Sequence, residues 1–127
     1  DYNFSLHFYG PYSEEIKADI GLAERAGLVR ETPRTAQDGT EYFVVSAEPF
    51  QALPDLGHLK EPLARLVSED STVLELAATY DAFRVMGLSH DAAVQSLRAK
   101  KGDKCDGGRE ERALEVLLRL RLQEVAA

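Results

Sequence analysis

The chain has 127 residues, of which 44% are hydrophobic and 29% are charged, a composition typical of one globular domain. No apolar run approaches the ~18 residues that a membrane-spanning helix needs, and a single cysteine excludes an internal disulfide. We therefore expect a protein compatible with the reducing cytoplasm and without a membrane partner.

The net charge of −7 is distributed unevenly along the chain. Residues 1–58 carry ten acidic and four basic side chains, a net charge of −6, whereas residues 59–127 carry twelve acidic and eleven basic ones, a net charge of −1. Binding to nucleic acid phosphates depends on clustered Lys and Arg. The charge of the first half therefore disfavours a nucleic acid partner.

The first expected element is a strand, because apolar and polar side chains alternate with a period of two from Tyr2 to Tyr9. We expect Gly10 and Pro11 to end it, since proline cannot donate to a strand ladder. Ser13 is a suitable N-cap for a helix expected over residues 14–26, whose apolar residues recur at helical spacing.

A β-hairpin is expected after this helix. Residues 28–34 form a short strand candidate, in which Pro33 marks an edge position. Asp38 and Gly39 then predict a tight turn, because this pair tolerates positive φ. Residues 41–47 are rich in β-branched and aromatic side chains and predict the returning strand.

A connector bracketed by Pro49 and Pro54 leads to a helical region. The expected helices cover residues 59–68, a segment capped by Asp70 or Ser71 that stops at Gly87, a segment capped by Ser89, and residues 109–125. A polar, glycine-rich break over residues 100–108 is expected before the last helix.

The order strand, turn, helix, strand, turn, strand is that of a winged helix. We therefore expect an α+β chain: a winged helix-turn-helix with a two- to three-stranded sheet over residues 1–55, and a helical C-terminal region of about four helices over residues 56–127. The helix at 14–26 would take the recognition position and residues 28–47 would form the wing. The two parts are expected to pack into one compact domain.

An aromatic corner is the most distinctive feature of the sequence. It consists of Phe8, Tyr9, Gly10, Pro11 and Tyr12. Glycine and proline set a bend, and tyrosines can bury their rings while their hydroxyls reach a partner. Two interpretations remain open: a corner of the core, or an exposed aromatic docking surface.

Nucleic acid contacts are a second candidate, because a winged helix places its second helix in the major groove. The side chains available for phosphate contact are Lys17, Arg25, Arg30 and Arg34. Carboxylates accompany them along the helix and around the hairpin: Glu14, Asp19, Glu24, Glu31, Asp38 and Glu41. Because carboxylates oppose phosphate binding, this site is disfavoured relative to a solvated surface.

Catalytic and metal sites are not indicated. His7, His58 and His90 lie far apart in the sequence and have no metal-ligand spacing with Cys105. Cys105 lies in a polar segment beside Lys104, a setting that favours a lowered thiol pKa, but no base lies at a recognisable spacing. We expect no enzymatic activity, no metal, no cofactor and no small-molecule substrate.

The stretch His7-Phe8-Tyr9-Gly10-Pro11-Tyr12-Ser13-Glu14-Glu15, with the helix end Leu22…Gly27-Leu28, resembles the bacterial and archaeal YwgA-like proteins. The pattern is more distantly similar to the SocA-like antitoxin, or Panacea, domain. The resemblance implies a winged-helix-type domain of regulatory or unknown role. It also implies helices before the corner, so we expect this chain to be a fragment.

The sequence thus favours a non-enzymatic regulatory or protein-interaction module, with a protein partner or self-association. The expected surfaces are the aromatic corner and an apolar stripe on the last helix, formed by Leu114, Leu117, Leu118, Leu122 and Val125. The alternative is a DNA-binding transcriptional regulator or antitoxin-like protein.

Overall fold

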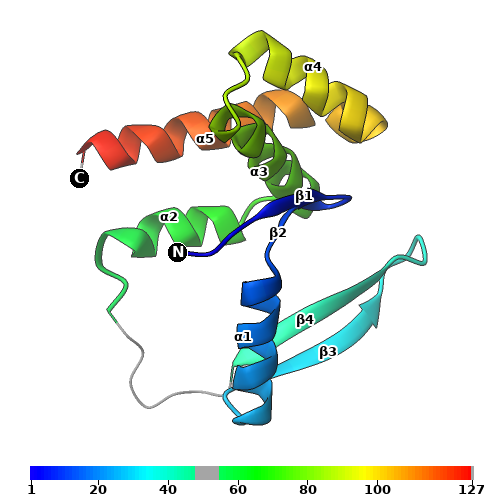
Figure 1. Cartoon of the computed structure of the whole chain (residues 1–127), viewed down its shortest axis with the longest axis vertical. Helices are drawn as coiled ribbons and strands as arrows, with labels where there is room; N and C mark the ends of the chain where they lie inside the picture. The colour runs from blue at the N-terminus through cyan, green and yellow to red at the C-terminus, as the bar shows by residue number, and fades with distance from the viewer. Residues whose placement is uncertain (48–54, 127) are drawn as a thin grey trace. The chain divides into compact units, whose positions relative to one another are not determined.

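The computed structural model describes residues 1–47 and 55–126, with side chains described as far as Arg121. Within these residues the chain is α+β, as predicted, with five α-helices and two antiparallel two-stranded sheets (Figure 1). It divides into an N-terminal unit, Asp1–Phe4 with Ser13–Asp55, and a helical unit, Ser5–Tyr12 with Leu56–Ala127. Residues 5–12, which the sequence grouped with residues 1–55, have their contacts in the helical unit.

Helix α1 (Glu14–Arg25) begins the larger segment of the N-terminal unit. The Ser13 side chain accepts a hydrogen bond from the backbone N–H of Ile16 at 3.3 Å, which satisfies one of the free donors of the first turn. Gly27, at a φ of +74°, follows the end of the helix. This confirms the predicted helix, one residue shorter than expected.

The second sheet of the chain is a ribbon of β3 (Val29–Thr35) and β4 (Glu41–Ala47). The turn between them uses Gly39 at a φ of +85°. The Asp38 carboxylate accepts a hydrogen bond from the Thr40 backbone N–H at 2.9 Å, and this bond lowers the pKa of Asp38. The predicted hairpin is confirmed, and its two strands form a sheet of their own.

The helical unit contains four α-helices among its described residues, the number that the sequence predicted. They are α2 (Lys60–Val67), α3 (Ser71–Val85), α4 (His90–Lys101) and α5 (Arg109–Ala126), with short 3₁₀ turns η1 (Gly57–Leu59) and η2 (Gly102–Cys105). The side chains of Asp70 and Ser89 cap α3 and α4.

The buried core of the helical unit lies where α3 meets α4 and α5 (Figure 1). Leu76 of α3, Leu97 of α4 and Ala113 of α5 are completely buried. The remaining core residues also come from these three helices: Val73, Ala77, Tyr80, Ala93 and Val116. By contrast, α1 and α2 contribute no buried residue.

The first strand differs from the sequence prediction. Instead of one strand ended by Gly10 and Pro11, the chain forms a small hairpin of β1 (Ser5–His7) and β2 (Gly10–Tyr12). Gly10 adopts a φ of +113°, which lets the chain turn back directly after Tyr9. Pro11 is tolerated in β2 because both strands of a two-stranded sheet are edge strands.

The predicted break over residues 100–108 is also wrong in part. Helix α4 continues to Lys101 and ends at Gly102, which has a φ of +52°. The short turn η2 then covers Gly102–Cys105, and Gly107 and Gly108, which also have positive φ, precede α5. The predicted connector between Pro49 and Pro54 lies outside the described residues.

Candidate functional site

The β1–β2 hairpin presents the aromatic corner. His7 pairs with Gly10, so Phe8 and Tyr9 form the turn between the strands. Gly10 is buried against α3: a Cβ added to it would lie 3.4 Å from Oγ1 of Thr79 and 3.7 Å from the carbonyl oxygen of Glu75. A Cβ here would be in ordinary contact with α3, so it is the φ of +113°, which other residues rarely adopt, that favours glycine at this position.

A buried lysine fixes the turn of this hairpin. The Lys101 side chain is 2% exposed, and its Nζ donates to the carbonyl oxygen of Phe8 at 2.5 Å and to Oε1 of Glu75 at 2.5 Å. A buried ammonium group is stable only when it is paired and hydrogen-bonded. Lys101 therefore ties the C-terminal end of α4 to α3 and to the hairpin turn.

Glu75 is the acceptor that Lys101 shares with Lys104. Lys104 Nζ donates to Oε1 and Oε2 of Glu75 at 2.9 and 3.0 Å, and it also lies 5.1 Å from the centre of the Tyr9 ring. Burial by itself would raise the pKa of Glu75, but the hydrogen bonds from the two lysines outweigh it and lower that pKa. Glu75 is thus held ionised between two cations.

The side chains at the turn point into solvent although their backbone is anchored. Phe8 is 88% exposed and Tyr9 is 72% exposed. Pro11 and Tyr12 are half-buried, and the Tyr12 ring stacks on His7 with ring centres 4.6 Å apart. Of the five corner residues, two therefore form an exposed aromatic pair, which we call the hairpin tip, and three support it.

Sequence reasoning missed the three side chains that anchor the tip. Nothing in the spacing of Glu75, Lys101 and Lys104 shows that they gather beneath a turn more than 60 positions earlier in the chain, where Lys101 bonds Phe8. The sequence singled out Lys104 only as a neighbour of Cys105. A faint signal was present in Lys101, which lies four residues after the apolar Leu97 and so faces the same side of its helix.

The four predicted nucleic acid contacts all lie in the N-terminal unit. Lys17 and Arg25 belong to α1, while Arg30 and Arg34 belong to β3. All four are exposed, and none has an ion pair among the described residues. Acidic groups of α1 are engaged by the start of the chain, where the Tyr2 hydroxyl donates to Asp19 at 2.6 Å.

The strand register separates the charges of the ribbon. Alternate residues of paired strands share a face, so Arg30 and Arg34 lie with Thr32 on one face of the ribbon. The residues opposite them on β4 are Tyr42, Val44 and Ser46, and we call this set of six the arginine face. Glu31 and Glu41 belong to the other face, which corrects the prediction that they crowd the two arginines.

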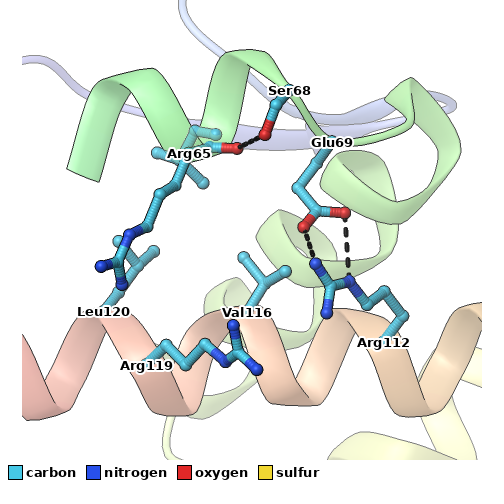
Figure 2. Close-up of a pocket in the computed structure, with 8 residues that line it drawn as sticks. Arg65, Ser68, Glu69, Arg112, Val116, Arg119 and Leu120 are labelled. Carbon is cyan, nitrogen blue, oxygen red and sulfur yellow. Dashed lines mark hydrogen bonds and ion pairs between the residues drawn. The ribbon is translucent and has the colours of Figure 1, made fainter. Parts of the chain in front are cut away.

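A hollow in the helical unit is lined by three arginines and by side chains of α2 and α5 (Figure 2). Arg112 bonds Glu69 in a bidentate pair, and the other two guanidinium groups also have carboxylate partners, Arg65 with Glu61 and Arg119 with Glu115. Each positive charge is matched by a negative one, so the hollow has no net charge with which to attract an anion.

The reactive groups that the sequence singled out are not brought together. Cys105 Sγ donates to the carbonyl oxygen of Leu97 at 4.0 Å, and burial raises the pKa of the thiol, with Glu110 adding to the effect. The expected lowering of this pKa is therefore wrong. His90 accepts or donates a 2.8 Å hydrogen bond with the buried Tyr80, and His7 stacks on Tyr12.

Within residues 1–47 and 55–126, no group of three or more His, Cys, Asp or Glu side chains is arranged to hold a metal ion. Among the helices of the same residues, none combines the length and apolar character required to cross a membrane.

No protein-family model matches the chain, and comparison with curated proteins and with solved structures likewise returns no match. The resemblance to YwgA-like proteins therefore stays a prediction.

Proposed function

We propose that this chain is a non-enzymatic regulatory module of winged-helix type that binds a protein partner through the hairpin tip. In this proposal α1 takes the position of the recognition helix and the β3–β4 ribbon that of the wing, since the elements follow one another in the winged-helix order.

The observation that carries the proposal is the contrast between exposure and anchoring at the tip. Phe8 and Tyr9 are 88% and 72% exposed. The backbone carbonyl oxygen of Phe8, by contrast, accepts a hydrogen bond from the buried Lys101. Aromatic side chains are enriched in the centres of protein interfaces, because each buries a large area for few rotatable bonds. A pre-ordered turn lowers the entropic cost of binding.

The proposal is tested by capture of partners on the immobilised chain from an extract of the cells that produce it. The variant Phe8→Ser/Tyr9→Ser is compared with Val85→Ser/Met86→Ser, which removes two residues that are 81% and 66% exposed at the end of α3. We expect proteins held by the wild-type chain to bind the tip variant at least about tenfold more weakly. The control variant should retain them.

Equal retention of the same proteins by the tip variant and the wild-type chain would contradict this function. Loss on both variants alike would also contradict it, because it would indicate non-specific adsorption to apolar residues. Circular dichroism of each variant checks that its fold is preserved.

A second candidate function is DNA binding, and the arginine face favours it. Arg30 and Arg34 are exposed on a face of the ribbon that carries no carboxylate. This candidate ranks below the first because residues 1–58 have ten acidic and only four basic side chains.

Fluorescence anisotropy with a labelled DNA duplex at low salt separates the two candidates. If DNA is bound, Arg30→Ala/Arg34→Ala should weaken binding and flatten its salt dependence, while Glu31→Ala/Glu41→Ala on the other face should leave it equal or stronger. An absence of duplex binding at low salt would remove the candidate.

A further inference from the structure

Strand β4 has a free edge that carries an apolar segment. All seven of its residues are exposed, among them Tyr42, Phe43, Val44 and Val45 at 42 to 62%. It pairs with β3 on one side, and no other strand among the described residues pairs with it. An exposed apolar edge strand is a template for pairing with another strand.

The turn of the ribbon shows which backbone groups point to this edge. The Ala36 N–H donates to the Thr40 carbonyl oxygen at 2.8 Å, so these two residues form a hydrogen-bonded pair. Such pairs alternate with non-hydrogen-bonded ones along an antiparallel ladder. The N–H and C=O groups of Glu41, Phe43, Val45 and Ala47 therefore point away from β3.

The outer edge of β3 differs from that of β4 in two ways. The Glu31 N–H donates to Oε1 of Glu24 at 3.4 Å, so α1 occupies part of this edge. Pro33, two residues later, has no N–H to offer. The free edge of β4 has neither a proline nor a side-chain acceptor bound to it among the described residues.

We propose that β4 pairs antiparallel with β4 of a second copy of this chain, about a two-fold axis at Val44. In this register Phe43 lies opposite Val45 of the second copy, Tyr42 opposite Ser46, and Glu41 opposite Ala47. No like charges oppose one another, and all four outward-pointing residues of each strand find partners. Two ribbons thereby become one four-stranded sheet.

Charge selects this edge over the alternative. If β3 paired with itself about its central residue, Thr32, Arg30 of each copy would lie opposite Arg34 of the other. Pro33, which has no N–H, would then stand where the new strand pair needs a hydrogen-bond donor. Like charges directly opposite one another destabilise a strand pair. A single strand pair is a small interface, so the dimer is weak and forms as protein concentration rises.

Sedimentation equilibrium of the full chain over a range of concentrations tests the proposal. The wild-type chain is expected to approach twice the mass of one chain. We expect two double variants, Phe43→Lys/Val45→Lys and Phe43→Glu/Val45→Glu, each to raise the dissociation constant at least about tenfold. In either variant, position 43 of each copy faces a like charge at position 45 of the other copy. An equal mixture of the two variants should restore the dimer. Val85→Lys/Met86→Lys, the matched control on exposed residues of α3, should dimerise like the wild type.

Disulfide formation reports the register directly. In a Cys105→Ser background, Val44→Cys places two thiols on the axis, in a non-hydrogen-bonded pair with a Cα–Cα separation of about 4.5 Å, which suits a disulfide. Ser46→Cys, the control, places them out of reach.

We expect a covalent dimer on mild oxidation of the Val44→Cys chain and none with Ser46→Cys. A wild-type chain that stays monomeric at every concentration would overturn the proposal. So would a mixture of the lysine and glutamate variants that fails to associate, or faster cross-linking through position 46 than through position 44.

Discussion

Lys101 is the residue on which the hairpin tip depends most. It is buried and bonded both to Glu75 and to the Phe8 carbonyl oxygen, so its loss leaves a carboxylate with one lysine instead of two and a carbonyl without its donor. Removing one member of a buried charge pair is costly because the other remains desolvated.

We expect Lys101→Met to lower the free energy of unfolding by about 2–4 kcal/mol, measured by urea denaturation. The matched control is Lys100→Met, since Lys100 is the exposed neighbour on the same helix. The control should change stability by no more than about 0.5 kcal/mol. Similar effects of the two changes would mean that the contacts of Lys101 contribute little.

Gly10 gives a second test at the scale of single residues. Both Gly10 and Gly39 have positive φ, but only Gly10 has atoms of α3 within 4 Å of the position that a Cβ would take. These atoms are at ordinary contact distance, but the φ of Gly10, +113°, lies farther than the +85° of Gly39 from the left-handed helical region at about +57°. Gly10→Ala is therefore expected to cost about 1–3 kcal/mol, and more than Gly39→Ala, in the same denaturation experiment. Equal costs would mean that the larger φ of Gly10 adds no strain when a Cβ is introduced.

The Glu75 carboxylate makes part of the stability dependent on pH. Its pKa in the folded chain is lowered from the ordinary value of 4.5, so its contribution is complete above pH 4.5 and is lost as the pH falls through the folded-state pKa. The difference in unfolding free energy between the wild-type chain and Glu75→Gln should be largest at neutral pH and shrink below pH 4.5. A difference that stays constant through the acid range would contradict this role.

At the scale of elements, the central helix α3 and the β3–β4 ribbon differ most. Five residues of α3 are buried, including the completely buried Leu76, whereas every residue of β4 is exposed. Opening free energies follow the density of buried contacts. The ribbon should therefore open more often than α3.

Hydrogen exchange at low protein concentration measures this difference. Amides that donate within the ribbon, such as that of Val44, are expected to exchange at least about a hundredfold faster than those in the middle of α3. Equal protection of the two elements would contradict this expectation, because it would mean that the ribbon is as stable against opening as α3 although its side chains are exposed.

The sequence predicted most of these elements because their signals are local. Ser13, Asp70 and Ser89 cap helices where their side chains suggested, and Asp38 with Gly39 forms the turn of the ribbon. The first strand was mispredicted because Gly10 and Pro11 were expected to end it, whereas they begin β2 after a turn at Phe8 and Tyr9. Gly10 is buried against α3, a contact that is distant in the sequence.

The candidate site was predictable only in part for the same reason. The aromatic corner is visible as a run of neighbouring residues, but the sequence does not show which of them are exposed: Phe8 is exposed, whereas Tyr12 is half-buried. The anchor formed by Glu75 and Lys101 depends on folding across 26 residues, and no local pattern reports it.

At the scale of the whole molecule, the two surfaces for which we propose partners lie in different units. The hairpin tip belongs to the helical unit, and the free edge of β4 to the N-terminal unit. Changes at Phe8 and Tyr9 should therefore leave self-association through β4 unaltered, and changes at Phe43 and Val45 should leave partner capture unaltered. Coupled losses in sedimentation and capture would contradict this separation.

Photo-crosslinking in the producing cells tests the hairpin tip most directly. A photoreactive phenylalanine analogue at position 8 is compared with the same analogue at position 85, which is 81% exposed in the wild-type chain. We predict that position 8 links to a distinct protein, identified by mass spectrometry, and that Lys101→Met in the same chain weakens this link. The same set of products from both positions, or none from position 8, would contradict a function based on the tip.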